Sequence, residues 1–196
     1  MAIIAKDSGG GSFTPAPAGS HVAVCDMVVD LGLQENDYQG ERSIKHQVYI
    51  RWELVDEYLP TDATKRFSVG KFYGLSLHEK ATLRRHLESW RGVPFTPDQL
   101  KAFDIAKLLG APCLIAVTHG TKANGDINAK VDGVMKMPKN MPPPGDTTMT
   151  PLIYDDEHPA AYDSLPEWLQ KKVDAQIKPA NSAAELNDDP DDFVPF

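Results

Sequence analysis

The sequence has few cysteines and no long apolar run. Only Cys25 and Cys113 occur among 196 residues, and they form no CxxC pair. This excludes a disulfide-rich scaffold and a thiolate zinc site, so we expect two buried thiols in a reducing compartment. No stretch reaches the roughly 18 apolar residues that a membrane helix needs, and no signal-peptide pattern opens the chain. These absences predict a cytoplasmic protein without membrane contact.

The sequence also lacks the motifs of common catalytic sites. It contains no P-loop, GxSxG or HExxH motif, and its six histidines are scattered. The acidic cluster at 155–158 has oxygen ligands for a divalent cation. It lies among prolines, however, where a solvated charge run is the commoner explanation. The pair Asp126 and Lys130 is too sparse for a nuclease site. We therefore expect a protein that is not an enzyme and needs no cofactor or metal.

Charge is divided unevenly along the chain. Residues 1–150 hold 17 Lys and Arg against 17 Asp and Glu, whereas the remainder holds 3 against 11, so the net charge of −8 belongs to the C-terminal part. Nucleic-acid-binding domains often have a basic balance. Any nucleic-acid surface in this chain must therefore come from local clustering of cations.

Composition divides the chain into five parts. Glycine and proline gather near the N-terminus and after Met137, and the last residues lack an apolar period. Such stretches favour mobile leads, stiff linkers and disorder over packed structure. We predict a flexible segment 1–19, a folded domain 20–137, a proline-rich linker 138–163, a helix 164–177 and a disordered acidic tail 178–196.

Periodicity predicts five strands and one main helix in the folded domain. Apolar and β-branched runs indicate strands at 20–33, 46–54, 66–75, 112–119 and 127–137, the last two joined by an Asn124-Gly125 hairpin turn. A helix at 76–91, with Leu83, Leu87 and Trp90 facing inward, falls between the third and fourth strands. This order is typical of the OB-fold, a five-stranded Greek-key barrel. An α+β sandwich with an open sheet is the alternative.

Three capping boxes predict where helices begin. Ser76, Thr96 and Ser164 are each followed three residues later by Glu or Gln. In this motif the hydroxyl and the later side chain satisfy orphan backbone N–H groups. The last of these helices carries Trp168, Leu169 and Val173, which need an apolar partner. That partner is either the barrel or a second copy of the chain, so a homo-oligomer is one of the two alternatives.

Aromatic and basic residues cluster on the strands that form the ligand face of an OB-fold. In the second strand Val48, Ile50, Trp52 and Leu54 alternate with Gln47, Tyr49, Arg51 and Glu53, so we expect one core face and one solvent face. Phe72 stands between Gly70 and Gly74, which leaves bare sheet for a ligand. Rings among cations suit single-stranded nucleic acid, because bases stack and phosphates pair without sequence readout. The predicted contacts are Lys45, Tyr49, Arg51, Arg66, Lys71, Phe72, Tyr73, Lys122 and Lys130. Alternatively, the rings belong to the core.

The last nine residues form an acidic run that ends in apolar side chains. Such a run suits a basic surface beside a small apolar pocket. The predicted partner-binding residues are Asp188, Asp189, Asp191, Asp192, Phe193, Val194, Pro195 and Phe196. The pattern resembles the C-terminal tip of bacterial single-stranded DNA-binding proteins. That resemblance implies recruitment of replication, recombination and repair proteins.

A second resemblance covers most of the folded domain. The stretches at 67–92 (FSVGKFYGLSLHEKATLRRHLESWRG) and 103–115 (FDIAKLLGAPCLI) resemble small bacteriophage proteins encoded among recombination genes and thought to bind single-stranded DNA. The resemblance implies a sequence-tolerant single-stranded DNA-binding protein of phage replication or recombination, acting in the host cytoplasm. A protein-only adaptor and a strand-annealing protein are the alternatives.

Overall fold

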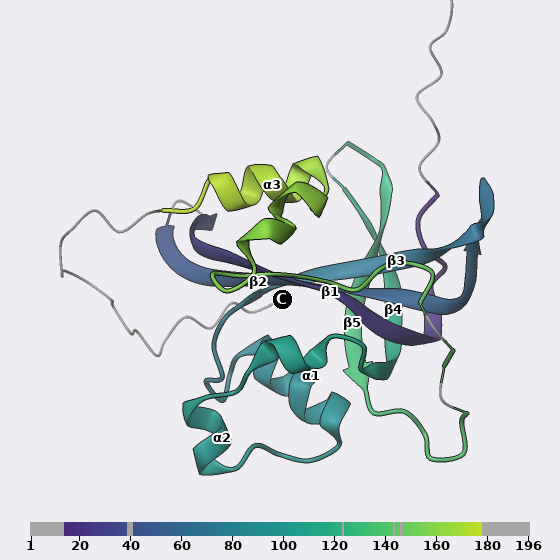
Figure 1. Ribbon diagram of the computed structural model, residues 1–196, viewed down its shortest axis with the longest axis horizontal. Coiled ribbons are helices and arrows are strands. Elements are labelled where there is room, and N and C mark those ends of the chain that lie inside the picture. Colours follow the sequence, from purple (N-terminus) through teal and green to yellow (C-terminus); the bar gives the residue numbers. More distant parts are fainter. Residues whose placement is uncertain (1–13, 39–40, 123, 143, 146, 178–196) are drawn as a thin grey trace, which may run out of the picture.

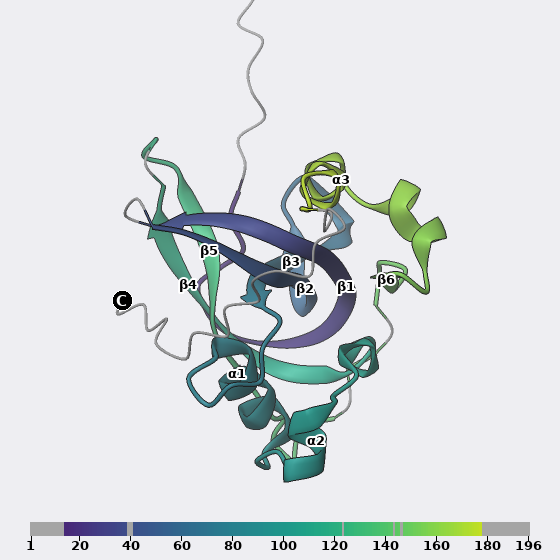
Figure 2. The same ribbon diagram turned by 90° about the vertical axis from the view of Figure 1, so that its left-hand side faces the viewer.

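A curled antiparallel sheet forms the centre of the protein. The computed structural model describes residues 14–38, 41–122, 124–142, 144–145 and 147–177. Its five main strands follow the order β3-β2-β1-β4-β5 and curl around one side (Figures 1 and 2). The expected mainly-β class with five antiparallel strands is therefore confirmed. The strands are β1 (Gly19–Tyr38), β2 (Glu41–Leu59), β3 (Asp62–Gly74), β4 (Pro112–Thr121) and β5 (Ile127–Met135).

Irregularities in β1 allow it to pair with strands on both sides of the curl. Its N-terminal part, Gly19–Val24, pairs with β4, while the register with β2 shifts between Cys25 and Met27 and again between Asp30 and Leu33. Bulges of this kind bend a strand and increase its twist. The curl brings the outer strands together, where Lys71 Nζ on β3 donates to the Val131 carbonyl on β5 at 2.8 Å.

The core lies inside the curl, as the alternation in β2 predicts. Val48, Ile50, Trp52 and Leu54 are all nearly inaccessible. Helix α1 (Thr82–Arg91) closes this side with the predicted residues Leu83, Leu87 and Trp90. The short elements α2 (Pro97–Lys101) and η1 (Ile105–Leu108) complete the helical layer below the sheet in Figure 1.

Local turn chemistry is confirmed at two of the four predicted positions. Thr96 and Gln99 form the capping box at the start of α2, and Gly125 has the positive φ of 87° that the hairpin turn requires. The prediction for Ser76 is wrong: its hydroxyl accepts from the His78 amide, and the helix begins later. The prediction for Ser164 is also wrong, because Ser164 ends a 3-10 helix and Pro166 precedes α3.

The outer face of β1, β2 and β3, turned away from α1, is covered by residues 147–177, here called the C-terminal segment. It contains β6 (Leu152–Tyr154), which pairs in parallel with β1, then η2 (Pro159–Ser164) and α3 (Glu167–Asp174). Figure 1 shows α3 and the helical layer on opposite sides of the sheet. The predicted linker 138–163 therefore contributes structure to the fold.

The N-terminal boundary also differs from the prediction. Ala16 is 3% exposed and joins the core, and its carbonyl accepts from His119 Nε2 at 2.8 Å. The part of the predicted flexible segment from residue 14 onward thus packs on β4, whereas residues 1–13 lie outside the described residues. None of the helices in the described ranges combines the length and the hydropathy that a membrane-spanning helix requires.

Candidate nucleic-acid interface

The predicted solvent face of β2 is buried under the C-terminal segment. Tyr49 is 7% exposed, Arg51 is 9% exposed and Glu53 is fully buried. The alternation in β2 correctly separates two faces, but both faces have packing partners. The prediction that Tyr49 and Arg51 face solvent is therefore wrong.

Tyr49 belongs to a second apolar cluster between the sheet and α3. Met27, Val29 and Leu31 of β1 pack there with Leu165, Leu169 and Val173. The C-terminal helix thus docks on its own sheet, which was one of its two expected partners. Desolvation in this cluster raises the pKa of the Tyr49 hydroxyl to about 12, so the group stays neutral.

Gly70 provides the space into which Tyr49 fits. A Cβ built on Gly70 would overlap the Tyr49 phenol ring and hydroxyl. The sequence pattern predicts that this glycine exposes the sheet to a ligand. In the structure, the space beside Gly70 is filled by the Tyr49 side chain, whereas nothing lies near a Cβ built on Gly74.

Two aromatic rings remain accessible at the edge of this cluster. Phe72 is 43% exposed and Trp168 is 47% exposed. Their ring centroids lie 6.1 Å apart, and the Tyr49 ring supports them at 4.9 Å from Phe72 and 5.2 Å from Trp168. Lys172 Nζ lies 6.0 Å from the Phe72 ring centroid. We call Phe72 and Trp168, with Tyr49 beneath them, the aromatic platform.

The platform combines Phe72, which the sequence pattern singles out, with Trp168, which it does not place on the predicted ligand face. Phe72 is accessible, as predicted. The sequence places Trp168 on the docking face of its helix, but Trp168 lies at the edge of that face and turns partly to solvent while Leu169 is buried. The sequence offers one signal for this placement, the position of Trp168 beside the apolar Leu169 on a short amphipathic helix.

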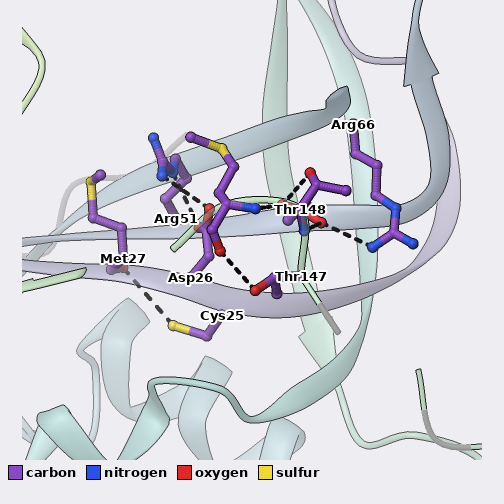
Figure 3. A network of polar contacts seen from close by, with 9 residues as sticks. Cys25, Asp26, Met27, Arg51, Arg66, Thr147 and Thr148 are labelled. Carbon is purple, nitrogen blue, oxygen red and sulfur yellow. Dashed lines mark hydrogen bonds and ion pairs between the residues drawn. The ribbon is translucent and has the colours of Figure 1, made fainter. Parts of the chain in front are cut away.

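Arg51 forms a buried ion pair instead of a phosphate contact. Its Nε and Nη2 atoms donate to the two carboxylate oxygens of Asp26 at 3.1 and 2.9 Å, and Asp26 is fully buried (Figure 3). Desolvation raises the pKa of Asp26 even though the Arg51 guanidinium opposes that change. In this bidentate ion pair, the Nε and Nη2 donors of Arg51 are both engaged within the protein.

Arg66 takes part in a second buried network, centred on Glu53. Arg66 Nη1 donates to Glu53 Oε1 at 3.0 Å, and its guanidinium lies 5.6 Å from the Tyr58 ring centroid. The same carboxylate accepts from the Thr148 amide at 2.8 Å, the Thr148 hydroxyl at 3.0 Å and the Met149 amide at 3.0 Å (Figure 3). The prediction for Arg66 is therefore wrong: it helps to anchor the C-terminal segment.

Tyr73 and Lys71 point toward the core side of β3. Tyr73 is 4% exposed, and its hydroxyl lies 2.9 Å from His86 Nδ1 on α1. Lys71 is half-buried at the seam between β3 and β5, where desolvation lowers the pKa of its amine. Tyr73 is thus a core residue, the alternative left open for the rings, and Lys71 closes the curl.

Two of the other predicted cations, Lys122 and Lys130, lie apart from the platform. Lys122 and Lys130 are exposed on the β4–β5 hairpin, and Lys45 is partly buried on β2. Figure 2 shows that hairpin and α3 on separate sides of the curled sheet. The predicted partner-binding residues 188–196 lie outside the described residues.

Comparison of the chain with models of known protein families and with curated proteins finds no match. The two resemblances noted in the sequence therefore stay expectations.

Proposed function

We propose that the protein binds single-stranded DNA without reading its sequence and stacks bases on the aromatic platform. The observation that carries this proposal is the accessibility of two neighbouring rings, Phe72 and Trp168, on a packed support. Every base has a π-face, and stacking on an aromatic side chain contributes about 1–3 kcal/mol per base. Exposed rings held by a rigid scaffold suit this sequence-tolerant mode.

The arrangement of the strands supports assignment to the OB-fold. The order β3-β2-β1-β4-β5 and a helix between β3 and β4 agree with a five-stranded Greek-key barrel. Ligands of that fold bind the face of the second and third strands. In this chain α3 covers much of that face and adds Trp168 to its remaining accessible edge. The nucleic acid would therefore run along the edge between β3 and α3.

Charge at the platform comes from few cations. Lys172 lies beside Phe72, whereas Arg51 and Arg66 are committed to buried carboxylates. We therefore expect stacking to contribute a larger share of the affinity than in a strongly basic groove, with a modest salt dependence. A role in phage replication or recombination, with recruitment of other enzymes by the acidic tail, follows from the resemblances and is part of the same proposal.

A protein-binding adaptor is the second candidate. Exposed aromatic residues with little nearby charge are also typical of the centre of a protein interface. The adaptor would bury Phe72 and Trp168 against a protein partner and would not respond to DNA.

A titration of full-length protein into a labelled thymidine oligonucleotide, followed by fluorescence anisotropy, distinguishes the candidates. We expect saturable binding that weakens with salt, and weaker binding to a duplex of equal length. For alanine variants of Phe72 or Trp168 in this titration, V93A is the matched control, because Val93 is an apolar residue outside the platform and is 49% exposed. Absence of binding at low salt would contradict the proposal and favour the adaptor. Faster pairing of complementary strands would instead indicate annealing.

A further inference from the structure

A cavity on the helical side of the protein combines an apolar lining with cations. Its volume is about 400 Å³, within the range of ligand sites. Three of its lining residues are cations, and none in the described part of the chain is acidic. It is separated from the aromatic platform by the sheet, because α1 and η1 lie on the opposite side from α3 (Figure 1). The lining residues are Trp90, Arg91, Phe103, Lys107, Leu108, Ala111, Pro112, Lys136 and Met137.

Arg91 is held in place but keeps an unused donor. Its guanidinium carbon lies 4.4 Å from the Phe95 ring centroid and 5.6 Å from that of Phe103. Its Nη2 atom donates to Gln99 Oε1 at 2.9 Å, while the buried Nη1 atom has no hydrogen-bond partner among the described residues. A buried donor without an acceptor is costly. Arg91 is thus oriented by stacking, and its Nη1 donor has no acceptor in the described part of the chain.

Two lysines add positive charge to the cavity. Lys136 is exposed, and Lys107 is exposed with its amine 3.8 Å from the Asp104 carboxylate. The Arg91 guanidinium already lies over the Phe95 and Phe103 rings. A base could not stack on the same ring faces, so the cavity is poorly suited to nucleic acid. Apolar walls with these cations suit an acidic peptide that inserts a bulky apolar side chain.

The chain itself contains a segment with this chemistry. Residues 188–196 combine four aspartates with Phe193 and Phe196. We infer that this segment binds the cavity, with a phenylalanine ring against the apolar lining and the aspartates facing Arg91 and Lys136. This occupant is chosen because its charge and its rings both match the cavity.

The chain is long enough to bring the segment there. Phe193 follows Ile177 by 16 residues, which span at most about 55 Å when extended. A fold of this size has a radius of gyration of about 15 Å. Tethering also gives the segment an effective concentration that reaches the millimolar range at any site within reach. Even a weak contact would therefore be populated within one molecule.

A peptide titration tests this inference without any nucleic acid. A fluorescent peptide of residues 186–196 is added to the full-length chain carrying F193A and F196A, so that its own segment does not compete. We expect saturable binding that K136E weakens by about tenfold. The control K101E makes the same charge change on α2, outside the cavity, where Lys101 contacts Asp98. It should change the affinity less than twofold.

Two results of this titration would overturn the inference. These are no saturable peptide binding, and equal weakening by K136E and K101E. In the otherwise unmodified chain, F193A with F196A should shift the indole N–H signal of Trp90, which lines the cavity and donates to the Pro112 carbonyl at 2.8 Å. An unchanged Trp90 signal would contradict binding within one molecule. Each result is independent of whether the platform binds DNA.

Discussion

Replacing Glu53 with glutamine should loosen the whole C-terminal segment. Glu53 is fully buried and accepts four hydrogen bonds, from Arg66, the Thr148 hydroxyl and the amides of Thr148 and Met149. Glutamine keeps one acceptor oxygen, and its amide nitrogen must face donors in either orientation. In either orientation the backbone amide of Thr148 or of Met149 then loses its acceptor in a part-buried hydrogen bond, and Arg66 loses its charged partner. We expect E53Q to lower the free energy of unfolding by about 3–5 kcal/mol.

Urea denaturation and amide hydrogen exchange would measure this effect. Exchange should accelerate at β6 and α3, because both follow the anchored residues Thr148 and Met149 in the chain. E167Q is the matched control: the Glu167 side chain is 80% exposed on α3 and pairs only with Lys171 among the described residues. It should have little effect. An E53Q protein within about 1 kcal/mol of wild type, with unchanged exchange at β6, would refute the anchoring role.

Three further predictions concern the platform, Gly70 and His86. F72A or W168A should weaken oligonucleotide binding about 5- to 150-fold, the equivalent of about 1–3 kcal/mol, while V93A leaves the anisotropy titration unchanged. G70A should displace the Tyr49 ring and cost about 1–3 kcal/mol in urea denaturation, and wild-type stability in that variant would contradict the packing described here. Burial, with help from Lys71 and Arg85, lowers the pKa of His86 from 6.5 to about 4. Between these pH values the unfolded chain binds a proton at His86 that the folded chain does not. The free energy of unfolding should therefore fall by about 2–3 kcal/mol as the pH drops from 6.5 to about 4. H86Q should flatten this part of the curve of unfolding free energy against pH.

The inner face of the sheet could be predicted from the sequence because its signal is local. Val48, Ile50, Trp52 and Leu54 alternate within one strand, and the helix pattern Leu83, Leu87 and Trp90 is equally short-range. Burial of one apolar face satisfies both patterns with no information from distant residues. The predicted strand ends are less accurate, since β1 and β2 extend beyond the predicted ranges 20–33 and 46–54.

The outer face could not be predicted in the same way. A polar alternation such as Tyr49, Arg51 and Glu53 normally indicates solvent, but here each side chain has a specific partner within the fold. Those partners include a bulge residue, Asp26, and a segment about one hundred residues away in the chain, neither of which leaves a periodic signal near β2. Periodicity separates the faces of a strand but does not reveal which of them another part of the chain covers.

Only one of the two accessible rings of the platform could be predicted from the sequence. Phe72 could be identified from its flanking glycines, although the space at Gly70 is filled by Tyr49. Trp168 required knowledge of where α3 docks, which depends on the apolar cluster of Met27, Val29 and Leu31. The sequence of an amphipathic helix indicates that the helix packs on another surface, but it does not specify which surface.

Photo-crosslinking of a halogenated thymidine oligonucleotide to the full-length protein tests the central claim most directly. Irradiation of the bound complex, followed by mass spectrometry of the digested protein, identifies the residues that touch the bases. We predict adducts on the peptides that contain Phe72 and Trp168. Adducts confined to other surfaces, such as the β4–β5 hairpin with Lys122 and Lys130, would contradict the platform as the site of base stacking.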